Sequence, residues 1–165
     1  MRLSAVIPTW TPVAVADTVA MTTLGFHNIQ GGVSTQRSEV REIYMGGQAG
    51  ASSPSLMVFG RCSTVGGATL TAARLAPLDP ASVLIANPPV AYQTTSGAFP
   101  QRSATLGMLL NLSYNAFGGV VRWVNGPDEI ISMLGAAASF GELSLNAFTG
   151  GTPGLMGSAI VIETL

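Results

Sequence analysis

The sequence has no lysine, one cysteine and one histidine, and only 9 % of its 165 residues are charged. An ordinary soluble domain carries about 25 % charged residues. A lone cysteine, Cys62, cannot form an intramolecular disulfide, so the chain gives no sign of an oxidising compartment. Together with a lone histidine, His27, it falls short of the three or four ligands of a zinc site. We therefore expect no metal and no cofactor.

The chain also lacks an excess of basic charge, because seven arginines and eight acidic residues leave a formal net charge of -1. Neither nucleic acid nor an anionic membrane is therefore an expected partner. Every basic residue is an arginine, which favours fixed, bidentate contacts at an interface. Genomic base composition would also produce a preference for arginine over lysine.

No long hydrophobic run suits a membrane helix. The uncharged stretch Ser103–Val121 is interrupted by Asn111, Asn115 and Gly118, and its apolar residues alternate, so it does not predict a span. The first 17 residues carry Pro8 and Pro12, which would break the apolar region of a signal peptide. Residues 1–17 are therefore predicted to form an extended N-terminal arm.

The sequence does contain the regularly spaced turn residues that are typical of an all-β protein. Its 20 glycines and 10 prolines separate short segments rich in Val, Ile, Leu, Phe and Thr. Apolar and other residues alternate most regularly late in the chain, which predicts strands with one apolar face. About eight strands are expected, at Val19–Phe26, Ser38–Met45, Leu56–Cys62, Thr105–Leu112, Val120–Val124, Glu129–Leu134, Glu142–Phe148 and Ser158–Glu163.

These strands predict a two-sheet β-sandwich as a single domain over residues 18–165, jelly-roll-like in topology, with an immunoglobulin-like arrangement as the second option. Ala68–Ala76 has helix-forming residues and suits a strand equally well. Five prolines in Leu75–Gln101 predict a long ordered loop.

No residue pattern in this chain predicts catalysis, and we expect no enzyme. Cys62 and His27 would form a nucleophilic pair only if the fold joined them, and a structural or interfacial His27 is favoured. Glu39 or Glu42 facing Glu142 would resemble a glycosidase pair, but no spacing selects these residues. The charges of the segment Arg37–Glu42 are expected to form cross-strand or intersubunit pairs instead.

A chain this poor in charge is expected to bury its apolar surface in a homo-oligomer. The N-terminal arm and the proline-rich stretch Leu75–Gln101 are the segments expected to contact other chains. The predicted interface residues are Trp10, Arg37, Glu39, Arg41, Glu42, Pro88, Pro89 and Tyr92.

Several segments carry a resemblance: Ser38–Ile43, Phe117–Val124 with the following Gly126-Pro127, Gly141–Ser144 and Gly157–Glu163. Between Arg37 and the C-terminus the chain resembles small tailed-bacteriophage virion proteins of the capsid decoration (cement) type. The resemblance implies a trimeric β-sandwich or jelly-roll subunit without catalytic residues. It also implies the major capsid protein as partner and the outer surface of an icosahedral head as location.

Two other functions remain open. One is a different virion subunit, such as a tail-tube, head-completion or major capsid protein. The other is a carbohydrate-binding β-sandwich that stacks sugars on Tyr92, Tyr114 or Trp123.

Overall fold

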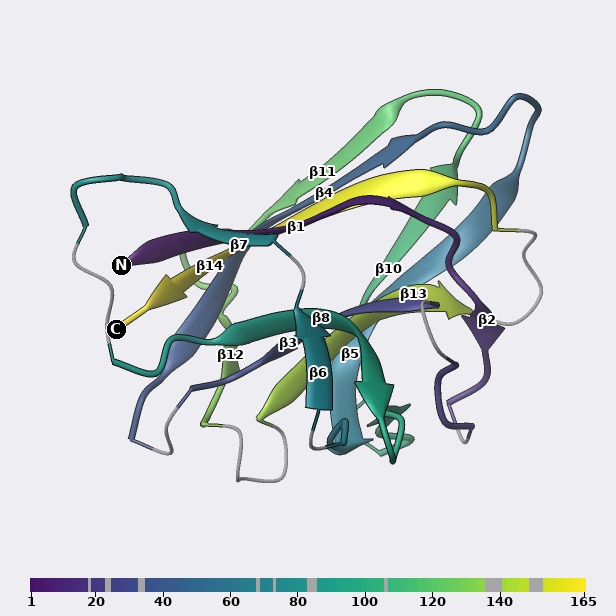
Figure 1. Cartoon of the computed structure of the whole chain (residues 1–165). Helices are drawn as coiled ribbons and strands as arrows, with labels where there is room; N and C mark the ends of the chain where they lie inside the picture. The colour runs from purple at the N-terminus through teal and green to yellow at the C-terminus, as the bar shows by residue number, and fades with distance from the viewer. Residues whose placement is uncertain are drawn as a thin grey trace.

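The chain forms a sandwich of two β-sheets in the computed structural model, which describes residues 1–17, 19–22, 25–32, 35–67, 69–72, 74–82, 86–105, 107–135, 141–148 and 153–165 (Figure 1). These residues hold fourteen strands and no helix. The strands are β1 (Arg2–Trp10), β2 (Ala14–Val15), β3 (Phe26–Gln30), β4 (Ser38–Gly47), β5 (Pro54–Thr64), β6 (Thr69–Ala72), β7 (Arg74–Pro77), β8 (Val90–Ser96), β9 (Gln101–Arg102), β10 (Met108–Asn115), β11 (Val120–Val124), β12 (Ile131–Met133), β13 (Glu142–Phe148) and β14 (Met156–Thr164).

The first sheet has the order β11-β4-β14-β1-β7, and β12 continues the β11 edge along β4. The second sheet has the order β10-β5-β13-β3-β8-β6, with β2 and β9 added beside β13 and β5. All the pairs are antiparallel except β2 with β13. The all-β, two-sheet prediction is confirmed, with more strands than the eight expected.

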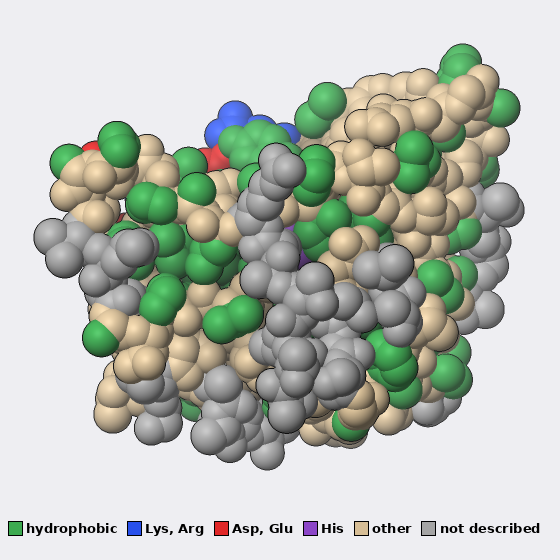
Figure 2. All heavy atoms as spheres, viewed as in Figure 1, with side chains coloured by type: hydrophobic (Ala, Val, Ile, Leu, Met, Phe, Trp, Pro, Cys, Tyr) green, Lys and Arg blue, Asp and Glu red, His purple; other side chains and the backbone are tan. Residues whose placement is uncertain are grey.

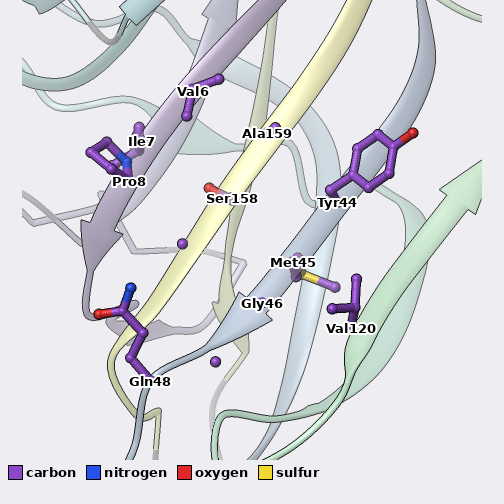
Figure 3. A pocket seen from close by; sticks show the side chains of 12 residues that line it. Val6, Ile7, Pro8, Tyr44, Met45, Gly46, Gln48, Val120, Ser158 and Ala159 are labelled. Carbon is purple, nitrogen blue, oxygen red and sulfur yellow. The ribbon is translucent and has the colours of Figure 1, made fainter.

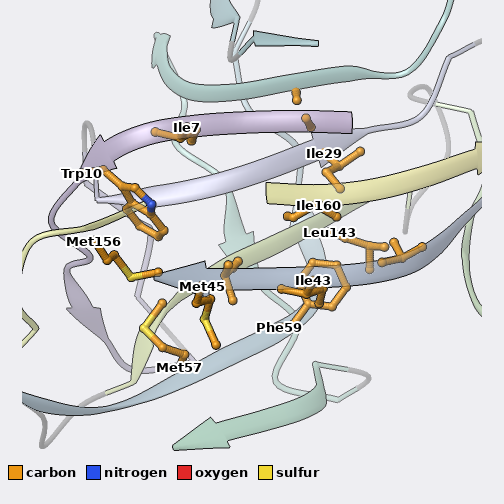
Figure 4. Close-up of a cluster of buried hydrophobic side chains, with 14 of the residues drawn as sticks. Ile7, Trp10, Ile29, Ile43, Met45, Met57, Phe59, Leu143, Met156 and Ile160 are labelled. Carbon is orange, nitrogen blue, oxygen red and sulfur yellow. The ribbon is translucent and has the colours of Figure 1, made fainter. Parts of the chain in front are cut away.

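The core lies between the two sheets (Figure 4). Ile43 and Met45 of β4 face it from the first sheet, and Phe59 of β5 and Leu143 of β13 face it from the second. The apolar row expected along β13 is therefore confirmed. Its alternate residues Glu142, Ser144 and Asn146 are also fully buried, because other segments cover the outer face of the second sheet. A smaller apolar cluster lies there, made of Met21, Phe26, Cys62 and Tyr92.

The N-terminal segment lies inside this chain's own sandwich, which corrects the prediction of an arm for contacts with other chains. β1 pairs with β14 on one side and with β7 on the other. Leu3, Ala5 and Ile7 alternate into the core, and this burial outweighs the interruption at Pro8, where the β1–β14 register shifts. β2 then joins the second sheet, so the segment crosses from one sheet to the other.

The proline-rich stretch holds more regular structure than the predicted loop. Its prolines border a proline-free run that forms β8, which pairs with β3 and β6. For Ala68–Ala76 the sequence favoured neither helix nor strand. The described part of this segment forms β6 and β7, and Ala68 and Ala73 lie outside the described residues. The prediction for Val19–Phe26 is wrong, because within the described part only Phe26 joins a strand.

The apolar row predicted through Met108, Leu110 and Leu112 is broken by a register shift. Met108 pairs with Gly60 while Leu110 pairs with Phe59, so one extra residue lies between them in β10. Met108 is 42 % exposed as a result, whereas Leu110 and Leu112 pack against the core. Leu106 lies outside the described residues. No helix in the described part of the chain is long and apolar enough to cross a membrane.

Candidate interaction surface

The outward face of the first sheet, directed away from the second sheet, carries a cluster of paired charges. Arg41 is its centre: its Nε lies 2.6 Å from Glu163 Oε2 and its Nη2 lies 2.8 Å from Glu39 Oε2. Arg2 and Arg37 flank these two carboxylates, each at 3.4 Å. We call these five residues the Arg41 cluster. Because β4 and β14 are neighbours, the cluster is made within one chain, and it offers a partner little unbalanced charge.

A second ion pair lies on the same face, beside the β11 edge. Arg122 Nη2 lies 2.7 Å from Glu42 Oε2, and the Tyr44 hydroxyl donates a hydrogen bond to the same oxygen. The guanidinium of Arg122 also stands over the Tyr44 ring, 5.2 Å from its centre. The hydrogen bonds from Tyr44 and Arg122 lower the pKa of Glu42. Glu42 therefore stays ionised and holds Arg122 in place.

An apolar groove of about 450 Å³ lies next to this ion pair (Figure 3). Its floor is low because Gly46, Gly157 and Ala159 carry little or no side chain. Val6 and Pro8 border it on the β1 side and Val120 on the β11 side. The remaining lining residues are Ile7, Tyr44, Met45, Gly47, Gln48 and Ser158.

The side of the sandwich formed by β10 and β11 is open and apolar. These strands end their sheets, and within the described residues no strand pairs with their outer edges. Val120 is 73 % exposed and Val124 48 % exposed. Trp123 is half-buried between the two sheets, beside a hollow of about 280 Å³ that Leu109, Leu110, Glu129, Ile130 and Ile131 also line. Unpaired edges bearing apolar side chains readily pair with another chain.

His27 and Cys62 do not form a nucleophilic pair. Neighbouring residues of a strand point to opposite faces, and His27 faces the core whereas Phe26 faces the smaller cluster that contains Cys62. Burial lowers the pKa of His27 to about 3 and raises the pKa of the Cys62 thiol. His27 is therefore neutral near pH 7, and Cys62 remains a thiol.

The partner of His27 in the core is Ser158 of β14. The Ser158 Oγ lies 2.8 Å from His27 Nδ1 and accepts a hydrogen bond from Trp10 Nε1 at 2.9 Å. Because Trp10 donates, the hydroxyl proton of Ser158 is free to point at His27. All three side chains are at most 5 % exposed, so the group joins the sheets and has no access for a substrate.

Glu142, considered above only as one half of a glycosidase pair, is the centre of a buried polar group. Its Oε1 accepts hydrogen bonds from Asn28 Nδ2 at 2.5 Å and from the Tyr92 hydroxyl at 2.6 Å. Its Oε2 accepts from the Gly66 amide at 3.1 Å. Burial raises the pKa of Glu142 despite these donors. Glu39 and Glu42 belong to the first sheet and lie on its outward face, whereas Glu142 is buried on the outer side of the second sheet, so neither of the considered glycosidase pairs forms.

The predicted interface residues divide into surface and interior. Arg37, Arg41 and Glu42 lie on the outward face of the first sheet, and Glu39 lies there in a buried position beneath its two arginine partners. Trp10 and Tyr92 belong to the chain's own interior, because core packing covers their rings. Pro88 is half-buried and Pro89 buried, just before β8. The exposed apolar edge at Val120 was not among the predicted residues.

Figure 2 shows how small the charged area is on one face of the molecule, where hydrophobic and uncharged polar atoms prevail. No group of three or more His, Cys, Asp or Glu side chains in the described residues could hold a metal ion. Comparisons of the chain with protein-family models, with curated proteins and with solved structures found no match.

Proposed function

We propose that the chain is a non-enzymatic virion structural protein, a capsid decoration or cement protein. It binds the outer surface of an icosahedral phage head and bridges major capsid protein subunits. The observation that supports this proposal is the open β10/β11 side, where apolar side chains flank unpaired strand edges and Arg122 is already paired with Glu42. Such a surface gains free energy when another chain covers it.

Stable attachment to a head would come from several contacts made at once. The open side would join the copies of a homotrimer, and a trimer that presents the same face of every copy to the head dissociates only when all its contacts open together. The paired charges at Glu42 and Arg122 border this edge and would set its orientation without adding net charge.

The other functions considered have less support. Tyr92 and Tyr114 are 0 % and 4 % exposed, so neither ring can stack on a sugar, and only the half-buried Trp123 remains for a carbohydrate-binding module. A tail-tube, head-completion or major capsid subunit would use the same open edge. The number of copies per particle separates these subunits from a decoration protein.

The experiment is reconstitution on heads that lack this protein. Added wild-type chain is expected to bind and to raise the tolerance of the heads to heat and osmotic shock. V120K/V124K, which charges the β11 edge, is expected to bind weakly, whereas L78K is the matched control because Leu78 is also exposed and follows β7 at the opposite edge of the first sheet. The proposal fails if purified particles never contain the chain, or if wild type leaves their tolerance unchanged.

A further inference from the structure

The turn after β11 holds an arrangement of chemical groups that the proposed function does not use. Asn125 is followed by Gly126, and it is the only one of the six asparagines that precedes a glycine. A glycine has no Cβ to hinder its backbone nitrogen, so this nitrogen can reach the preceding side-chain amide more easily than in any other residue. Both residues are half-buried, and the next four residues are exposed, so water reaches the turn.

Arg41 holds the amide of Asn125 from two sides. With the amide oriented so that donors meet acceptors, Asn125 Oδ1 accepts a hydrogen bond from Arg41 Nη1 at 3.2 Å and Asn125 Nδ2 donates to Arg41 O at 3.1 Å. The guanidinium itself is fixed by Glu39 and Glu163. A cation bound to a carbonyl oxygen stabilises the negative charge that develops there when a nucleophile attacks the carbon.

Gly126 is free to act as that nucleophile. Its N–H has no hydrogen-bond partner among the described residues, while its carbonyl accepts from Glu129 N at 3.2 Å and closes the turn. The Glu129 carboxylate lies beside it, with Oε2 3.6 Å from the position that a Cβ on Gly126 would take. A carboxylate, which can accept a proton, thus lies near Gly126.

From these contacts we propose that Asn125 is a site of self-modification, which converts in the folded chain to aspartate or isoaspartate through a succinimide. Gly126 N loses its proton and bonds to Asn125 Cγ, and the Cγ–Nδ2 bond then breaks and releases ammonia. Water adds to either carbonyl of the ring and opens it, so one water is consumed and no redox partner is needed. The new carboxylate lies beside Arg41 and joins its cluster. This inference does not depend on the proposed function.

The experiment compares the folded protein with a synthetic peptide of residues 123–129, both kept at neutral pH. Cleavage at Arg122 and Glu129 releases a fragment in which Asn125 is the only side-chain amide, so mass spectrometry reads its conversion as a gain of one mass unit. Electron-transfer fragmentation then separates aspartate from isoaspartate. The folded chain is expected to convert at least as fast as the peptide. Slower conversion, or none, would show that Arg41 shields the amide and would overturn the proposal.

Two variants test the roles of the residues. G126A should fold, since its Cβ meets only ordinary contacts from Glu129, and should convert about tenfold more slowly because the Cβ hinders the attack. R41K keeps the positive charge but cannot contact Glu39, Glu163 and Asn125 together, and about tenfold slower conversion is expected. The unfolding midpoint of R41K shows that it is folded. If folded R41K converts as fast as wild type, Arg41 does not polarise the amide and the proposal is wrong.

Discussion

At the scale of single residues, the buried ionisable groups decide how the stability of the protein depends on pH. His27 is fully buried, and its only described hydrogen-bond partner is Ser158, whose hydroxyl favours the neutral imidazole. Glu142 is buried without a basic partner and is satisfied only by neutral donors. The two groups act in opposite directions on acidification.

Replacement of His27 should remove the contribution of this residue to the loss of stability at acidic pH. The pKa of His27 falls from 6.5 to about 3 on folding, so the unfolded chain binds more protons between these values. The free energy of unfolding therefore falls as pH drops through this window, by about 1 kcal/mol per pH unit from this group. In H27Q this contribution is absent, and urea titrations at a series of pH values measure the difference in slope. Parallel slopes for the two proteins would contradict the assignment.

Replacement of Glu142 should change the pH dependence of the free energy of unfolding in the opposite direction. Its pKa in the folded chain lies above its ordinary value, so its favourable contribution exists below pH 4.5 and is lost as the pH rises through the folded pKa. The stability of E142Q relative to wild type should therefore increase with rising pH over that range. E129Q, at an exposed position, is the control. An E142Q difference that stays constant with pH would show that the pKa of Glu142 is the same in the folded and unfolded chains, and would contradict the prediction.

At the scale of elements, two adjacent glycines at the end of β4 differ in the space around them. A Cβ on Gly47 would lie 2.0 Å from the Ala116 carbonyl oxygen, whereas a Cβ on Gly46 would meet no atom within 4 Å. G47A is expected to lose about 2 kcal/mol of unfolding free energy, because backbone must move, and G46A less than about 0.5 kcal/mol. Chemical denaturation measures both. Equal losses would mean that the β4 end and the Ala116 turn do not pack this closely.

The strands that the sequence predicted well are those with uninterrupted alternation. Val120–Val124 matches β11, and Glu142–Phe148 matches β13. We did not predict β1, because Pro8 and Pro12 indicated an extended arm. Leu3, Ala5 and Ile7 nevertheless alternate into the core. Short strands such as β2 and β9 have no pattern of their own and exist only because neighbouring strands pair with them.

The candidate surface was less predictable than the fold, because its contacts join residues far apart in the sequence. The charges of Arg37–Glu42 suggested ion pairs, but Glu163 joins them only through the β4–β14 register. Likewise, the exposure of Val120 depends on β11 being the last strand of its sheet. Strand order cannot be deduced from local alternation, since the same apolar pattern suits a central strand and an edge strand.

At the scale of the whole molecule, the open side predicts self-association. A sizing column with light scattering is expected to give wild type a mass above the 16.9 kDa of one chain. V120K/V124K should lower the measured mass toward that of a single chain, whereas L78K should leave the mass unchanged. Added salt should not dissociate the assembly, because Arg122 at the β11 edge is already paired with Glu42 and the contact is apolar. A stable wild-type monomer would contradict this prediction.

The pairing of β1 with β14 constrains when the protein can fold. Arg2 lies opposite Glu163, so the middle of the first sheet joins segments that are far apart in the sequence. Nascent β1 must wait for β14 with its apolar residues exposed, and pairings over such sequence separations form slowly. The synthesis of β14 therefore sets the moment at which this sheet closes, and a chaperone that shelters β1 until then would raise the yield of native protein.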